Sequence, residues 1–149
     1  MKMLIAIDGS DFSEAALQSV IERPWNAGTE IKVLHVVEPP ALLIGREMGA
    51  YDPEFEMVWK AVRERAKDLM DKAAQKLRAA GFQVSTELVE GEPKSLIIDA
   101  ANEWHADMIV VGSHGWSGLN RFLMGSVSEA VVRHAHCSVE IIRTPSVNN

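Results

Sequence analysis

The sequence predicts an α/β fold in which helices cover both faces of a parallel β-sheet. Short apolar runs alternate along the chain with segments of helical periodicity, and this alternation is typical of crossover units between parallel strands. The chain has 149 residues, 47% of them hydrophobic and 24% charged, which suits one globular domain over residues 1–149. The runs predicted to be strands are residues 3–7, 31–37, 82–89, 108–111 and 139–142.

The first two predicted helices have recognisable starts. Asp11 and Glu14 have the spacing of a capping box, which predicts the start of the first helix. Pro53 after Asp52 predicts a long second helix that ends at Gly81. An apolar stripe runs along this second helix and comprises Val58, Val62, Ala66, Leu69, Ala73 and Leu77.

The last two helices are predicted in the same way. Pro93 begins the third helix, and Ser126 with Glu129 has the spacing of another capping box, which begins the fourth. Between the second strand and the long helix, residues 38–51 form a connection longer than the usual length of about two to six residues. This connection is either a mobile flap or an ordinary surface loop, and the sequence leaves both possibilities open.

Charge and composition exclude several classes of protein. The formal net charge of -6 repels nucleic acid phosphates, so an anionic ligand must be held by local donors. The single cysteine, Cys137, excludes an intramolecular disulfide framework. The apolar runs are too short for a signal peptide or for the roughly 18 residues of a membrane span, so we expect a cytoplasmic protein that binds no membrane. The signatures of P-loop, esterase-elbow and dinucleotide-binding enzymes are absent.

The most informative segment follows the fourth strand. Gly112 and Gly115 allow backbone amides to approach phosphate oxygens closely, and nine residues later Gly125 and Ser126 open a helix whose N-terminus attracts anions. Free amides of Gly125, Ser126 and Val127 are the expected phosphate donors. The alternative is that the glycines only turn the chain and Ser126 only caps the helix.

A second loop, at residues 8–11, follows the first strand. Ligands of open parallel sheets bind beyond the carboxyl ends of the strands, where the strand order reverses. The two loops therefore face one crevice if the first and fourth strands are neighbours. Asp8 is a candidate acceptor for ribose hydroxyls or a candidate metal ligand, whereas Asp11 fits better as a helix cap.

Three further side chains near the glycines are weaker candidates. His114 and Arg121 are candidates for phosphate contacts, with a structural or solvent-facing role as the alternative for each. Trp116 either flanks a ligand or covers the loop. No pair of residues stands out as nucleophile and base, which leaves no specific catalytic proposal.

These motifs resemble the universal stress protein family, and the resemblance covers nearly the whole chain. The glycine segment matches the family's nucleotide pattern of glycine, two residues, glycine, nine residues, glycine and serine. The residues that carry the resemblance are Ile5, Ala6, Ile7, Asp8, Gly9 and Ser10; Val33, Leu34, His35, Val36 and Val37; Gly91, Glu92 and Pro93; and Val110, Val111, Gly112, Ser113, His114, Gly115, Gly125, Ser126, Val127 and Ser128.

The resemblance implies a three-layer, Rossmann-like sandwich with five parallel strands in the order 3-2-1-4-5. It also implies the ATP-binding branch of the family, with Mg²⁺ or Mn²⁺ bridging the phosphates. Val36 and Val37 would contact adenine. The ribose and phosphate roles would fall on Asp8, Gly9, Ser10, Asp11, Gly112, Gly115, Gly125, Ser126 and Val127. Their neighbours Val111, Ser113, His114, Arg121 and Ser128 are further candidate contacts.

Family members commonly form homodimers through the last strand. Here that strand is apolar and would otherwise leave unpaired amides at a sheet edge: Val139, Glu140, Ile141 and Ile142. The expected function is that of a nucleotide-dependent regulator or switch of the stress response. A slow ATP hydrolase or nucleotidyl-transfer enzyme, with Asp8, Asp11 or His114 as base, and an interaction protein with a vestigial site are the alternatives.

Overall fold

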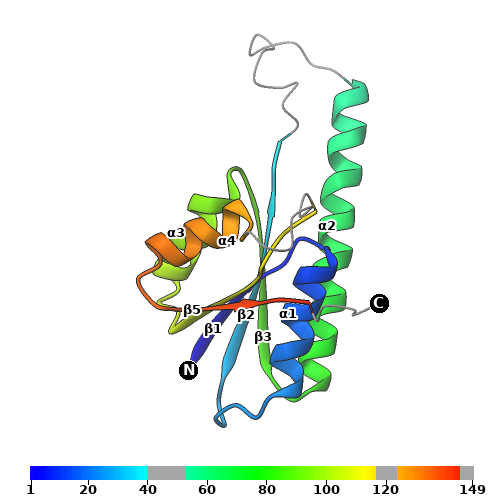
Figure 1. Cartoon of the computed structure of the whole chain (residues 1–149). Helices are drawn as coiled ribbons and strands as arrows, with labels where there is room; N and C mark the ends of the chain where they lie inside the picture. Colours follow the sequence, from blue (N-terminus) through cyan, green and yellow to red (C-terminus); the bar gives the residue numbers. More distant parts are fainter. Residues whose placement is uncertain (40–52, 117–123, 145–149) are drawn as a thin grey trace, which may run out of the picture.

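Five parallel strands form one sheet in the order β3-β2-β1-β4-β5 (Figure 1). The computed structural model describes residues 1–39, 53–116 and 124–144. Each strand lies within one residue of its predicted bounds, and the predicted strand order is confirmed. The elements are β1 (Lys2–Ala6), α1 (Asp11–Glu22), β2 (Glu30–Val37), α2 (Pro53–Ala79), β3 (Gln83–Glu90), α3 (Pro93–Glu103), β4 (Met108–Gly112), α4 (Ser126–His134) and β5 (Ser138–Ile142).

Apolar side chains alternate between the two faces of the sheet and pack under different helices. Met3, Ile5 and Val33 lie in the core that α1 and α2 cover, whereas Leu4 and Leu34 lie in the core that α3 and α4 cover. The side chains of Met3, Leu4 and Ile5 are fully buried, as expected for the central strand of a parallel sheet. The three-layer sandwich is therefore confirmed.

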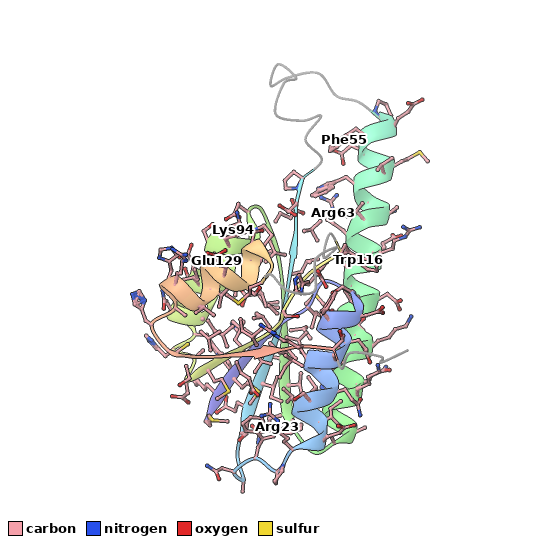
Figure 2. The ribbon with its side chains drawn as sticks, in the orientation of Figure 1. Arg23, Phe55, Arg63, Lys94, Trp116 and Glu129 are labelled. Carbon is pink, nitrogen blue, oxygen red and sulfur yellow. The ribbon has the colours of Figure 1, made fainter. Side chains whose placement is uncertain are left out.

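The buried face of α2 differs from the predicted stripe. Val58 is 56% exposed, while its neighbour Trp59 is buried, which makes the prediction for Val58 wrong. The first turns of α2 extend beyond the sheet, where Phe55 stacks on Trp59 (Figures 1 and 2). Trp59 also packs with Val37 at the end of β2, so this large aromatic side chain, rather than Val58, sets the face that is buried.

Both predicted capping boxes are wrong by one position. The N-cap of α1 is Ser10, whose hydroxyl accepts a hydrogen bond from the Ser13 amide, and Asp11 is an exposed first helical residue. The N-cap of α4 is Gly125, which leaves Ser126 as an exposed first helical residue. In each case the residue before the predicted cap adopts the extended conformation that an N-cap requires.

Several expectations fall on residues that the structure does not describe. The connection at residues 40–52 and the segment at residues 117–123, which contains Arg121, lie outside the described residues. Among the described residues, no helix is long and apolar enough to cross a membrane. Cys137 is half-buried just before β5, and burial, with a smaller effect of the Asp107 carboxylate, raises the pKa of its thiol. A raised pKa disfavours the reactive thiolate.

Candidate functional site

A cleft of about 860 Å³ opens at the carboxyl ends of β1, β2 and β4. Because β1 lies between β2 and β4, the loops after β1 and β4 meet at this edge of the sheet, as the position of a strand-order reversal requires. The starts of α3 and α4 complete the wall. Predicted site residues that line the cleft are Asp8, Val36, Val37, Val111, Gly112, His114, Gly115, Gly125, Ser126, Val127 and Ser128.

The turn after β1 is held by hydrogen bonds of its own residues. The Ser10 amide donates to Asp8 Oδ1 over 2.9 Å, and the Gly9 amide donates to the Ser13 hydroxyl over 3.1 Å. Gly9 has a φ of +81°, a conformation that favours glycine. Gly9, Ser10 and Asp11 do not line the cleft, so Asp8 is the one residue of the loop at residues 8–11 that does.

The loop after β4 lies directly against this turn. The Trp116 indole donates to the Asp8 carbonyl oxygen over 2.7 Å, and a β-carbon at Gly115 would stand 2.7 Å from Asp8 Oδ2. Trp116 lies four residues past the end of β4 and is 77% exposed. Trp116 thus covers the Asp8 turn and also lines the cleft, and contact with a ligand stays a prediction.

The start of α4 is anchored to β4 by Ser113. The Ser113 carbonyl oxygen accepts from the Gly125 amide over 2.8 Å and from the Ser128 hydroxyl over 2.9 Å. This anchoring directs the first turn of α4 into the cleft. The prediction of a free Gly125 amide is therefore wrong, because this amide is bonded to Ser113. The amides of Ser126, Val127 and Ser128 occupy positions that have no intrahelical acceptor, and no side chain of the described residues caps α4. The start of α4 is therefore suited to an anion.

Protein contacts alone exclude a side chain at Gly112 and leave little room for one at Gly125. A β-carbon at Gly112 would lie 2.7 Å from the backbone of Phe12, and one at Gly125 would lie 3.1 Å from the Ser113 carbonyl oxygen. These glycines do more than turn the chain, because they let α1 and the α4 loop approach β4 closely. Their presence therefore needs no ligand to explain it.

His114 has one paired ring nitrogen and one unpaired one. Its Nδ1 lies 3.0 Å from the Ser113 hydroxyl, and its ring packs against Phe12 with centroids 5.0 Å apart. Its Nε2 is buried and has no hydrogen-bond partner among the residues that the structure describes. Ser113 itself is 2% exposed and does not line the cleft, so its observed role is to hold the loop.

The end of β2 forms the base of the cleft between β1 and β3. The last paired residues of β1 and β2 are Ala6 and Leu34, so Val36 lies beyond the point where the two strands separate. Val37 still faces β3, because its carbonyl oxygen accepts from the Gly91 amide over 3.0 Å. The backbone of Val36 is therefore directed toward the side that β1 has left.

The start of α3 supplies cleft residues that were not predicted. The Glu92 carboxylate caps α3 by accepting from the Lys94 and Ser95 amides at 3.1 and 2.9 Å. Burial opposes ionisation, but these hydrogen bonds and the Lys94 charge hold the pKa of Glu92 below its ordinary value. Lys94 is an exposed cation at this rim (Figure 2). The sequence could have predicted these cleft residues, because residues 91–93 follow β3 at the same edge of the sheet.

Further cleft residues lay outside the predicted set, some of them because they are ordinary core or strand-end residues. They are Ala6, Ile7, Ser13, Leu34, His35, Glu38, Glu92, Pro93, Lys94, Ile97 and Met124. In the described parts of the chain, no group of three or more His, Cys, Asp or Glu side chains is placed to hold a metal ion.

Comparison with known proteins defines the family. The model of the universal stress protein family matches residues 1–143. Universal stress protein YxiE of Bacillus subtilis is 34% identical over 145 residues, which cover 95% of this chain and 98% of the relative. The chain belongs to the universal stress protein family, as its sequence motifs predicted.

Solved structures of the family share this fold. The universal stress protein UspA from Lactobacillus plantarum superposes with a TM-score of 0.82 at 30% identity, over 96% of this chain and 97% of that one. A universal stress protein from Archaeoglobus fulgidus, solved in complex with dAMP, has a TM-score of 0.65 at 26% identity, over 95% and 97% of the two chains. A relative with this fold thus binds an adenine nucleotide.

Proposed function

We propose that this universal stress protein binds an adenine nucleotide in the cleft and that its phosphates occupy the start of α4. The observation that carries the proposal is the contrast between helix starts. Ser10 caps α1 and Glu92 caps α3 with their own side chains, whereas α4 has no side-chain cap and its first residues line the cleft. An anion at this helix start gains both the free amides and the helix dipole.

The cleft also has residues suited to the ribose and to the adenine base of the nucleotide. Asp8 presents a carboxylate beside Gly115, at a position suited to accept hydrogen bonds from ribose hydroxyls. Val36 and Val37 line the cleft at the end of β2, where we propose that adenine binds. A cleft of about 860 Å³ is large enough for a nucleoside triphosphate, since small-molecule sites typically measure about 300–1,000 Å³. The dAMP complex of the archaeal relative supports an adenine nucleotide as the ligand.

We further propose ATP with Mg²⁺ or Mn²⁺ as the physiological ligand. The described cleft residues carry the carboxylates of Asp8, Glu38 and Glu92, and Lys94 is the one lysine or arginine among them. Triphosphate charge therefore needs further neutralisation. Mg²⁺ is commonly held by one or two carboxylates together with phosphate oxygens, and Asp8 fits that role because it lies beside the loop proposed to hold the phosphates. A bound divalent ion would neutralise and orient the phosphates.

The proposed role is that of a cytoplasmic regulator whose surface depends on nucleotide occupancy. Trp116 supports this role, because it is exposed on the outside yet joined to the Asp8 turn on the wall of the cleft. A nucleotide that moves this turn also changes the surface around Trp116. The expected ordering of residues 113–124 and 38–51 falls mostly outside the described residues, and limited proteolysis with and without ATP tests it.

We also propose that the protein forms a homodimer through β5. This strand has one neighbour, β4, and the Ile142 carbonyl oxygen accepts from the Ser113 amide on that side. Alternation of backbone direction then leaves the Ile141 amide facing outward, where a second β5 can pair with it. Ile141→Pro removes that donor. Sedimentation should show a dimer for the parent chain and a monomer for the variant, while a parent monomer would contradict the proposal.

The nucleotide proposal is tested by identifying what the native protein carries. Acid release followed by chromatography and mass spectrometry should recover ATP, and calorimetry on the emptied protein should give one ATP site per chain. A Gly115→Trp variant, whose side chain would collide with Asp8 across the cleft wall, is the control. Recovery of ADP would instead favour the hydrolase, whereas an empty cleft that also fails to bind added ATP would favour the interaction protein.

A further inference from the structure

Strands β1 and β2 separate at a defined hydrogen bond. The Ile7 amide donates to the Leu34 carbonyl oxygen over 2.9 Å, which continues the pairing of a parallel ladder by one bond beyond the end of β1. If the ladder continued, the Val36 amide would next donate to the Ile7 carbonyl oxygen, and the Gly9 amide would donate to the Val36 carbonyl oxygen. Neither of these two bonds forms.

The two groups on β1 that would have bonded to Val36 are hydrogen-bonded to side chains instead. The Ile7 carbonyl oxygen accepts from His35 Nδ1 over 2.6 Å. The Gly9 amide donates to the Ser13 hydroxyl over 3.1 Å. Because a carbonyl oxygen can only accept, His35 Nδ1 must carry a proton in this contact, so the neutral ring is the Nδ1–H tautomer. His35 and Ser13 thus end the β1–β2 ladder.

The result is a peptide edge at the base of the cleft to which no other residue in the described part of the chain is hydrogen-bonded. The amide of Val36 is a donor and its carbonyl oxygen an acceptor, and both are directed toward the side that β1 has left, where Val36 lines the cleft. Adenine has an acceptor at N1 beside a donor at its 6-amino group, which complements this edge. Guanine and hypoxanthine have a donor at N1 and an acceptor at O6, which reverses the pattern.

We propose that His35 is a positioning residue that keeps this edge of Val36 free and thereby makes the site select adenine. His35 acts through the Ile7 carbonyl oxygen and need not touch the base. If the Nδ1–H of His35 is removed, the Ile7 carbonyl oxygen accepts a hydrogen bond from the Val36 amide instead. Strand β1 then pairs with β2 for one more residue. The choice of base rests on the proposed function, whereas the effect on Val36 concerns the nucleotide-free protein.

The first test measures amide hydrogen exchange of Val36 by NMR in the nucleotide-free protein. His35→Leu removes the donor, and His35→Asn is the matched control because its Nδ2 takes nearly the place of Nδ1. The Val36 amide should exchange about tenfold more slowly in H35L than in the parent, since a backbone hydrogen bond of ordinary net strength has formed. H35N should exchange as the parent does. Equal exchange rates in H35L and the parent would overturn the proposal.

The second test compares ATP with inosine triphosphate, which differs at the 6-position and N1 of the base. The parent and H35N should prefer ATP by about tenfold or more, and H35L should lose most of that preference. A general loss of fold lowers affinity for both nucleotides equally and leaves the ratio unchanged. An H35L ratio equal to that of the parent would contradict the role of His35. If the parent binds neither nucleotide, the proposed function fails, and the exchange of Val36 still decides whether His35 ends the ladder.

Discussion

The carboxylate of Asp8 lies so close to Gly115 that a β-carbon there would stand 2.7 Å from Asp8 Oδ2. The two residues are 107 positions apart in the chain, and the pairing of β1 with β4 brings their loops together. This contact joins the proposed ribose acceptor to the proposed phosphate loop. The position of the Asp8 carboxylate therefore depends on glycine, which has no side chain, at position 115.

Gly115→Ala should therefore weaken nucleotide binding more than it weakens the fold. The added methyl group displaces the Asp8 carboxylate, which is the end of a side chain and can rotate, so we expect the free energy of unfolding to fall by less than about 1 kcal/mol. ATP affinity should fall about tenfold because Asp8 leaves its position. Calorimetry and urea unfolding measure the two quantities. An unchanged ATP affinity would contradict the assigned role of this contact.

Gly112→Ala should give the opposite result. Its methyl group would lie 2.7 Å from the backbone carbonyl of Phe12, which cannot move without a shift of α1. We expect a loss of about 1–3 kcal/mol in the free energy of unfolding, the usual cost of overpacking. Urea unfolding checks this, with Gly115→Ala as the comparison. If both variants unfolded at the same urea concentration as the parent, the packing account of Gly112 would be wrong.

Ser128 and Ser126 should respond differently to the same change. Ser128 is 3% exposed and its hydroxyl donates to the Ser113 carbonyl oxygen, so Ser128→Ala should lower the free energy of unfolding by about 1–2 kcal/mol. Ser126→Ala should change it by less than about 0.5 kcal/mol, because Ser126 is an exposed first helical residue and not the cap. Thermal unfolding of both variants tests this. A larger effect at Ser126 would restore the capping box.

Glu92 should make stability depend on pH in the acid range. Although burial opposes it, the amides of Ser95 and Lys94 lower the pKa of Glu92 in the folded protein from the ordinary value of 4.5. A lowered folded pKa contributes stability that is present above the unfolded pKa and is lost as the pH falls through the folded value. Glu92→Gln should reduce stability near neutrality and flatten this acid dependence. Unfolding curves from pH 7 to pH 3 check it, and parallel pH profiles for the two proteins would contradict it.

The fold was predictable because its signals are local and repeated. Each strand is a short apolar run in the sequence. A run such as Met3, Leu4 and Ile5 is continuously apolar because all of its side chains are buried in the sheet. Helix starts were less predictable, since Ser10 and Asp11 are both good caps and only the backbone conformation selects between them. The buried face of α2 depended on Trp59, whose partner Val37 is distant in the sequence.

The two loops that form the site could be predicted from the sequence, but the roles of several neighbouring side chains could not. The loops after β1 and β4 were predicted to face one crevice if the two strands are neighbours, and Asp8 and Gly115 do line the same cleft. The close contact between these two residues was not predicted. Ser10 and Ser113 are near in sequence to cleft residues but are turned into the protein, where their polar groups hold the loops. The role of His35 had no local signal, because its hydrogen-bond acceptor, Ile7, lies 28 residues away on another strand.

We propose that one adenine nucleotide spans the cleft from Val36 to the start of α4, and amide NMR during an ATP titration can follow both ends of the cleft at once. We expect the resonances of Val36, Ser126 and Val127 to shift and to saturate together at one ATP per chain, while amides at the opposite end of the sheet, such as Asp107, stay unchanged. Saturation of Ser126 and Val127 without any change at Val36 would mean that the protein binds phosphate alone. No change at either end would contradict the claim.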